Sequence, residues 1–258
     1  MTALTASVVR GTAGDDNLTG SGNDDDFLLW QGGSDTVDGG GGNDIFRMGA
    51  ALDAGDKLDG GTGKDAVLLN GDYSAGLVLN ADTITNIEVM QFTAGHNYNI
   101  TTNNGNVAAG EMLLVKGGEL GSGNTLTFDG SAEHDGKFYI TGGAGNDTLT
   151  GGTRHDVFDL SHGGSDTAHG GKGDDLFVVG NTINGGDFID GGAGNDTVTM
   201  GGAFGAGASL IFSTANFTGI DTIRLDAMTG VTTVTISNDI TSGGASLTVD
   251  ASGMGARR

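Results

Sequence analysis

Residues 170–178 read GGKGDDLFV, and residues 191–199 read GGAGNDTVT. Both follow the pattern GGxGxDxUx, in which U is an apolar residue. Three further complete copies are GGGGNDIFR (39–47), GGTGKDAVL (60–68) and GGAGNDTLT (142–150). Because such nonapeptides, complete and eroded, recur at a short period, the sequence predicts a solenoid in which each coil contributes the same small unit.

Eroded copies of the same nonapeptide complete two blocks of six Asp-centred turns. Every aspartate of the second block lies 131 residues after its partner in the first, which indicates a tandem duplication. The first block contains Asp16, Asp25, Asp35, Asp44, Asp56 and Asp65, and the second contains Asp147, Asp156, Asp166, Asp175, Asp187 and Asp196.

Each residue type in the nonapeptide has a physical role. Paired glycines allow positive φ, so a six-residue turn can direct its carbonyl oxygens inward while the aspartate adds a carboxylate. These hard oxygen ligands suit calcium, and we expect several ions to be bound by the twelve aspartates. The U residue, two positions after each aspartate, should point into a narrow core while its neighbours face solvent.

The spacing predicts which turns are neighbours. Two nonapeptides should form the two sides of one coil, so Asp16, Asp35 and Asp56 would stack along one edge and Asp25, Asp44 and Asp65 along the other. The step along each edge is 19 and then 21 residues. We expect the irregular positions to be absorbed as bulges, at Leu29 and residues 48–50 and again at Leu160 and residues 179–181.

These nonapeptides resemble those of the repeats-in-toxin (RTX, haemolysin-type) calcium-binding family. The resemblance implies a right-handed parallel β-roll and export from a Gram-negative bacterium by type I secretion, to the medium or the cell surface. It places the calcium-ligating aspartate on all twelve positions, most securely on Asp44, Asp65, Asp147, Asp175 and Asp196. The turns before Asp35, Asp56, Asp166 and Asp187 lack the complete glycine framework, and GGTRHD (151–156) has Arg154 at the fourth position.

The duplication extends beyond the turns, because LVLNADTITNIEVMQF (77–92) matches LIFSTANFTGIDTIRL (210–225) after a two-residue insertion. We therefore predict a lead-in over residues 1–10, a first unit over 11–141 and a second, truncated unit over 142–258. Each unit begins with a calcium β-roll (11–68 and 142–199) and continues as β-solenoid without the turns (69–141 and 200–258).

Composition agrees with calcium-dependent folding. The chain has 33 acidic and 11 basic residues, a net charge of -22, with 52 glycines and neither proline nor cysteine. This charge would repel itself in a compact state unless cations neutralised it, so the metal-free chain should be largely unfolded. The acidic balance disfavours nucleic acid. No apolar stretch suits a signal peptide or membrane insertion.

Other candidate sites are weaker. Sequence motifs of known catalytic sites are absent, so we do not expect an enzyme. His155, His162 and His169 fall seven residues apart, but surface drift explains them more simply than a zinc or nickel site. For Asp129, Glu133 and Asp135, solvated turn acids are a simpler interpretation than an extra calcium loop. Trp30 and the exposed-looking Tyr73 and Tyr98 could contact a carbohydrate or a surface, although scattered aromatic residues need no such explanation.

Two functions follow from this sequence. The first is a non-enzymatic calcium-binding β-roll that serves as a structural or adhesive segment of a secreted or surface protein and contacts cell-surface or extracellular matrix components. The alternative is a calcium-dependent folding and secretion tail of a type I secreted hydrolase or toxin. A catalytic domain in the parent reading frame would favour the tail, whereas further 131-residue units would favour the surface protein.

Overall fold

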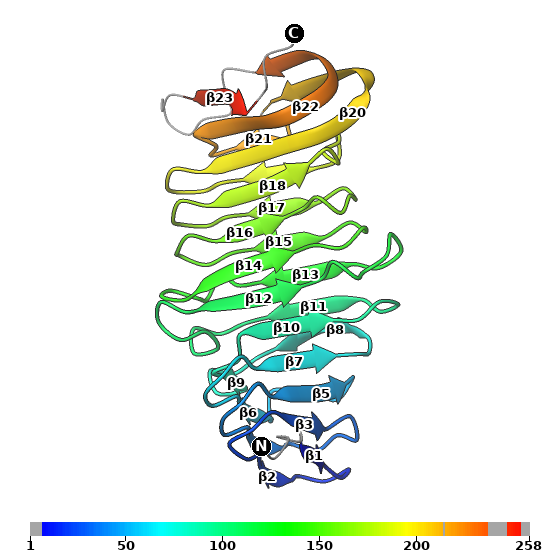
Figure 1. Cartoon of the computed structure of the whole chain (residues 1–258), viewed down its shortest axis with the longest axis vertical. Helices are drawn as coiled ribbons and strands as arrows, with labels where there is room; N and C mark the ends of the chain where they lie inside the picture. Colours follow the sequence, from blue (N-terminus) through cyan, green and yellow to red (C-terminus); the bar gives the residue numbers. More distant parts are fainter. Residues whose placement is uncertain (1–6, 214, 237–246, 254–258) are drawn as a thin grey trace, which may run out of the picture.

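The structure, a computed structural model, describes residues 7–213, 215–236 and 247–253, which form one solenoid of parallel β-strands (Figure 1). The coils follow one another in sequence order from the N-terminus to the C-terminus. Every assigned strand within these ranges belongs to a parallel sheet, and no helix is present there. A membrane-spanning helix is accordingly not found in this part of the chain. The predicted all-β solenoid is confirmed.

Three parallel sheets form the walls of the solenoid. The longest has twelve strands: β1 (Ser7–Arg10), β3 (Asp25–Leu28), β5 (Ile45–Gly49), β7 (Ala66–Leu69), β10 (Val89–Phe92), β12 (Met112–Lys116), β14 (Lys137–Thr141), β16 (Val157–Asp159), β18 (Leu176–Gly180), β20 (Thr197–Phe212), β22 (Thr222–Ile236) and β23 (Thr248–Gly253). A four-stranded sheet contains β2 (Asn17–Thr19), β4 (Thr36–Asp38), β6 (Lys57–Asp59) and β9 (Ile84–Thr85). A seven-stranded sheet contains β8 (Tyr73–Val78), β11 (Tyr98–Thr101), β13 (Leu126–Asp129), β15 (Thr148–Thr150), β17 (Thr167–His169), β19 (Phe188–Asp190) and β21 (Phe217–Thr218).

The core contains apolar ladders, in which the U positions of the nonapeptides are continued by apolar residues of the strands between and after the two blocks. In the twelve-stranded sheet, strand pairing places the buried side chains in one continuous row: Phe27, Phe46, Val67, Met90, Val115, Ile140, Phe158, Phe177, Val198 and Ile223. The residues on either side of each U position are more exposed, as alternation in a strand requires. The predicted strand register is therefore confirmed.

Two expected bulges are present at equivalent places. The pairing register shifts between Arg47 and Gly49 in β5 and between Val178 and Gly180 in β18. The prediction of bulges at Leu29 and Leu160 is wrong. Both are buried core residues, and their N–H groups donate to the carbonyl oxygens of Arg47 and Val178, so each continues the regular pairing of the strand before it. Their apolar side chains are better placed in the core than in an outward bulge.

The prediction that Tyr73 and Tyr98 are exposed is wrong. Both side chains are buried and their rings stack with centroids 6.0 Å apart. The Tyr73 hydroxyl donates to the carbonyl oxygen of Gly49, and the Tyr98 hydroxyl donates to that of Leu69. These bonds satisfy the polar end of each side chain inside the core. Trp30, by contrast, is half exposed.

Candidate metal-binding turns

The twelve predicted aspartates lie at or immediately before the start of a strand and form lines along the solenoid. Asp16, Asp35 and Asp56 precede β2, β4 and β6, which are neighbours in the four-stranded sheet. The turns of Asp25, Asp44 and Asp65 lead into β3, β5 and β7 in the twelve-stranded sheet. The second block repeats this division between the seven-stranded and twelve-stranded sheets. The predicted stacking of alternate nonapeptides is confirmed.

A ladder of hydrogen bonds joins the aspartates of each line. The backbone N–H of one aspartate donates to Oδ1 of the aspartate in the next coil, for example from Asp25 to Asp44 at 2.7 Å and from Asp175 to Asp196 at 2.8 Å. The same bond joins Asp16 to Asp35, Asp35 to Asp56, Asp44 to Asp65, Asp147 to Asp166, Asp156 to Asp175, and Asp166 to Asp187. The N–H groups of Leu126 and Phe138 donate in the same way to Oδ1 of Asp147 and Asp156, so ten of the twelve aspartates use one oxygen to hold consecutive coils together. Asp16 and Asp25, the first of their lines, receive no such bond from the described residues, and Oδ1 of Asp25 is buried without a partner there.

The second carboxylate oxygen, Oδ2, separates eleven of the twelve aspartates, all but Asp166, into three classes. At the head of each block, Oδ2 accepts the N–H group four residues earlier, in Asp16, Asp25, Asp147 and Asp156. In Asp56 and Asp187 it accepts the N–H group three residues earlier. Oδ2 is buried without any hydrogen-bond partner in Asp35, Asp44, Asp65, Asp175 and Asp196. An unpaired buried carboxylate oxygen is costly, so these five positions require a cation or a proton.

Burial and mutual repulsion make the metal-free turns electrostatically unfavourable. Burial raises the pKa of Asp175 to about 8, opposed by the Asp156 N–H and assisted by the charge of Asp156. Burial likewise raises the pKa of Asp166 to about 7 and that of Asp65 to about 6. A divalent cation beside these carboxylates would reverse the effect, because opposite charge favours the ionised form.

In the complete turn over residues 39–44, the first glycine leaves room beside the unpaired oxygen. A methyl group on Gly39 would lie 2.5 Å from Oδ2 of Asp44 and 2.6 Å from the carbonyl oxygen of Gly60 in the next coil. The second and fourth glycines of this turn, Gly40 and Gly42, have φ of +89° and +109°. Carboxylate and carbonyl oxygens therefore border the same small space, and an all-oxygen donor set fits calcium.

A family model described as the RTX calcium-binding nonapeptide repeat, in four copies, matches residues 6–32, 31–50, 139–159 and 162–202. The chain contains RTX calcium-binding repeats. The matched ranges include ten of the twelve aspartates and leave out Asp56 and Asp65. No curated protein and no solved structure matches the chain significantly.

The RTX turns with an incomplete glycine framework do not behave alike. The turn before Asp35 retains positive φ at Gly32 and Gly33, and Oδ2 of Asp35 is unpaired as in a complete repeat. The turns before Asp56 and Asp187 close on their own carboxylate instead, through the N–H groups of Asp53 and Asn184. A cation at these two turns would share an oxygen that already accepts a hydrogen bond.

Two acidic residues that sequence reasoning missed continue the RTX ladders beyond the last nonapeptide. The N–H of Asp65 donates to Oε2 of Glu88 at 2.7 Å, and the N–H of Asp196 donates to Oδ2 of Asp221 at 2.9 Å. Both acids follow a residue with positive φ two positions earlier, Asn86 and Gly219. The match between residues 77–92 and 210–225 already aligned them, and this alignment was the available signal.

The three histidines do not converge on one site. His155 contacts the carbonyl oxygen of Asp174, His169 lies 3.6 Å from a carboxylate oxygen of Asp190, and His162 lies beside Gly118. Within the described ranges, no group of three or more His, Cys, Asp or Glu side chains is placed to share a metal ion. The RTX turns instead combine one or two carboxylates with backbone carbonyl oxygens.

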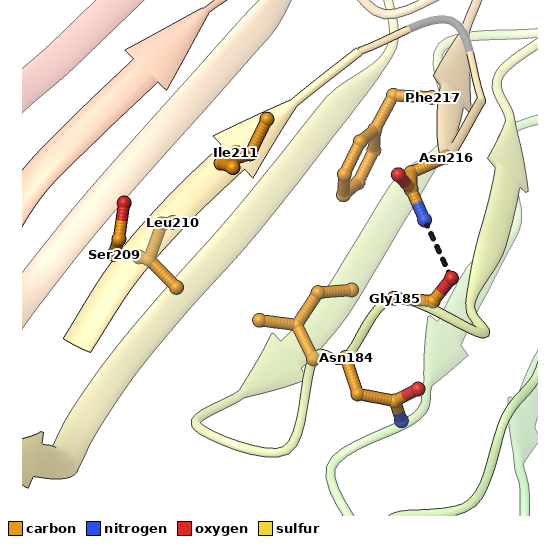
Figure 2. A pocket seen from close by; sticks show the side chains of 8 residues that line it. Asn184, Gly185, Ser209, Leu210, Ile211, Asn216 and Phe217 are labelled. Carbon is orange, nitrogen blue, oxygen red and sulfur yellow. Dashed lines mark hydrogen bonds between the residues drawn. The ribbon is translucent and has the colours of Figure 1, made fainter.

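A cavity of about 290 Å³ lies near the C-terminal end of the solenoid, between β20, β21 and the turn after β18 (Figure 2). Its walls are mainly apolar, with Leu210, Ile211 and Phe217, and an Asn216 side chain that donates to the carbonyl oxygen of Gly185. None of its eight lining residues carries an ionisable side chain. It therefore offers no ionisable side chain for acid–base chemistry.

Proposed function

We propose that this chain is a non-enzymatic calcium-binding β-roll, which acts as a calcium-stabilised structural or adhesive segment of a secreted or cell-surface bacterial protein. The observation that carries the proposal is the line of buried, unpaired carboxylate oxygens beside carbonyl oxygens of the next coil. The twelve aspartates are the proposed ligands, with the five unpaired ones as the strongest.

The proposed location outside the cell has two supports. RTX repeats are typical of proteins that Gram-negative bacteria secrete. Extracellular calcium modules commonly bind with Kd on the order of 10⁻⁴ to 10⁻³ M, so their sites fill where calcium is abundant. Surface and matrix components are the proposed partners of an adhesive segment.

A calcium titration followed by far-UV circular dichroism tests the proposal. The chain should be largely unfolded in chelator, because its net charge of -22 and its unpaired buried carboxylates oppose compaction. It should become β-rich in millimolar calcium. Magnesium is the matched control, and it should substitute poorly because it prefers octahedral geometry and loses its water reluctantly. The same β signal in chelator as in calcium would refute the proposal.

A further inference from the structure

The turn over residues 130–136 extends the second RTX block by one step toward the N-terminus. It precedes β14 and stacks on the turn over residues 151–156. The N–H of Thr153 donates to the carbonyl oxygen of Glu133 at 3.0 Å, and the Phe138 N–H donates to Oδ1 of Asp156 at 2.7 Å. This turn therefore occupies the place of a nonapeptide turn although its sequence, GSAEHDG, is not one.

Glu133 takes the position that a second glycine holds in the following coils. The bond from Thr153 to Glu133 is repeated from Lys172 to Gly152, at 3.2 Å, and from Ala193 to Gly171, at 2.9 Å. A methyl group on Gly152 would lie 3.2 Å from Cβ of Glu133, so the two positions are stacked directly.

The Glu133 carboxylate is fully buried and only half satisfied, which contradicts the prediction of a solvated turn acid. Its exposed fraction is 0%. Oε1 accepts the N–H groups of His134, Asp135 and Gly136, at 3.0, 3.1 and 2.9 Å. Three donors on one oxygen stabilise negative charge there. Oε2 is buried and has no hydrogen-bond partner.

Packing alone does not call for a carboxylate at this position. On the other line of turns, the equivalent position at the head of the block is Leu120, whose carbonyl oxygen accepts the Ala144 N–H at 2.8 Å. Leu120 and Glu133 even close their turns in the same way, each N–H donating to a glycine carbonyl three residues earlier. Leu120 is 1% exposed, so an apolar side chain fills this place well.

We propose that Oε2 of Glu133 is a ligand of an additional calcium site, outside the nonapeptides, between the turns over residues 130–136 and 151–156. Asp156 is the neighbouring acid that could share the ion, because its Oδ2 accepts the N–H of Gly152 at 2.6 Å and Gly152 is stacked on Glu133. Backbone carbonyl oxygens of the two turns complete an all-oxygen donor set suited to calcium. The site closes the N-terminal end of the line on the twelve-stranded sheet.

Anomalous scattering from crystals of the unchanged chain, grown with calcium, tests the site without a mutation. A peak about 2.3 to 2.6 Å from Oε2 of Glu133 is expected, which is the usual calcium–oxygen distance. Peaks at the nonapeptide turns with none at Glu133 would overturn this inference alone. Since the inference rests on the proposed function, a chain that binds no calcium anywhere would overturn both.

Counting ions in solution gives an independent test. Glu133→Gln keeps an oxygen for the three N–H groups, and Glu133→Leu installs the residue type found at Leu120. Each variant should bind one calcium ion fewer than the parent at saturation, measured by equilibrium dialysis. Glu111→Gln is the matched control, because Glu111 is an exposed glutamate just before β12. The number of calcium ions bound by this variant should not change. An unchanged count in either Glu133 variant would overturn the proposal.

Discussion

The hydrogen bonds of single carboxylates distinguish aspartates that the sequence treats as equivalent. Asp44 is fully buried, receives the Asp25 N–H on one oxygen and has no partner for the other. Asp16 is partly exposed, and its Oδ2 accepts the N–H of Thr12 at the end of the block. Calcium binding should therefore depend more strongly on Asp44 than on Asp16.

We expect Asp44→Ala to raise the calcium concentration at the folding midpoint by about tenfold or more, since losing even an outer partner of a metal ligand costs that much. Asp16→Ala should shift the midpoint far less, because it removes a partly exposed group at the end of its block. Titration of both variants with calcium, read by circular dichroism, measures the difference. Equal midpoints would contradict the role of the unpaired oxygen.

Strands of only three to five residues hold together because side chains stack from one coil to the next. Phe27 lies on Phe46 with ring centroids 5.0 Å apart and planes within 4°, and Phe158 lies on Phe177 at 4.8 Å and 11°. The two blocks thus contain the same aromatic pair at the same step of the ladder. Such short strands depend on this packing, since an isolated strand pair is marginal in water.

Phe177→Ala should destabilise the calcium-loaded fold by roughly 3 to 5 kcal/mol, because it leaves a cavity between Phe158 and Val198 in the ladder. Val178→Ala, on the outward side of the same strand, should change stability by about 0.5 kcal/mol. Chemical denaturation of both variants at saturating calcium provides the values. A larger effect at Val178 would place the strand register one residue off.

For the molecule as a whole, protons and calcium should act on the same carboxylates in opposite ways. Burial raises the pKa of Asp175 to about 8 and that of Asp65 to about 6, above the ordinary value of 3.8. When the pKa of a carboxyl group is higher in the folded chain than in the unfolded chain, protonation of that group favours folding. This stabilisation is fully present below the unfolded pKa and is lost as the pH rises through the folded pKa. The metal-free roll should thus be least stable at and above neutral pH.

We expect the calcium-free chain to gain β-structure as the pH falls from about 8 to about 5, because the raised pKa values lie in this window. Over the same range the calcium midpoint should rise, since protonation removes ligands. Circular dichroism at stepped pH, in chelator and in limiting calcium, tests both statements. A β signal in chelator that weakens on acidification through this window would contradict the account.

Much of this organisation could be predicted from the chain because it is local. The turn, the aspartate and the inward U residue lie within nine residues, so glycine conformation and strand alternation specify them without knowledge of distant contacts. The spacing of 19 and 21 residues then aligned Asp44 with Asp25 and Asp65, and Phe177 with Phe158. The division into two long repeat units stays a prediction.

The remaining features depend on which coil lies above or below. Glu88 follows Asp65 by 23 residues and Asp221 follows Asp196 by 25, so neither fits the period of the nonapeptides. Tyr98 is buried because its hydroxyl reaches a carbonyl oxygen 29 residues earlier in the chain. Glu133 is buried because the turn of the next coil covers it. Whether a residue outside the nonapeptides is buried depends on which side chains the neighbouring coil places against it. The nonapeptide pattern does not predict this, because these coils do not follow the pattern.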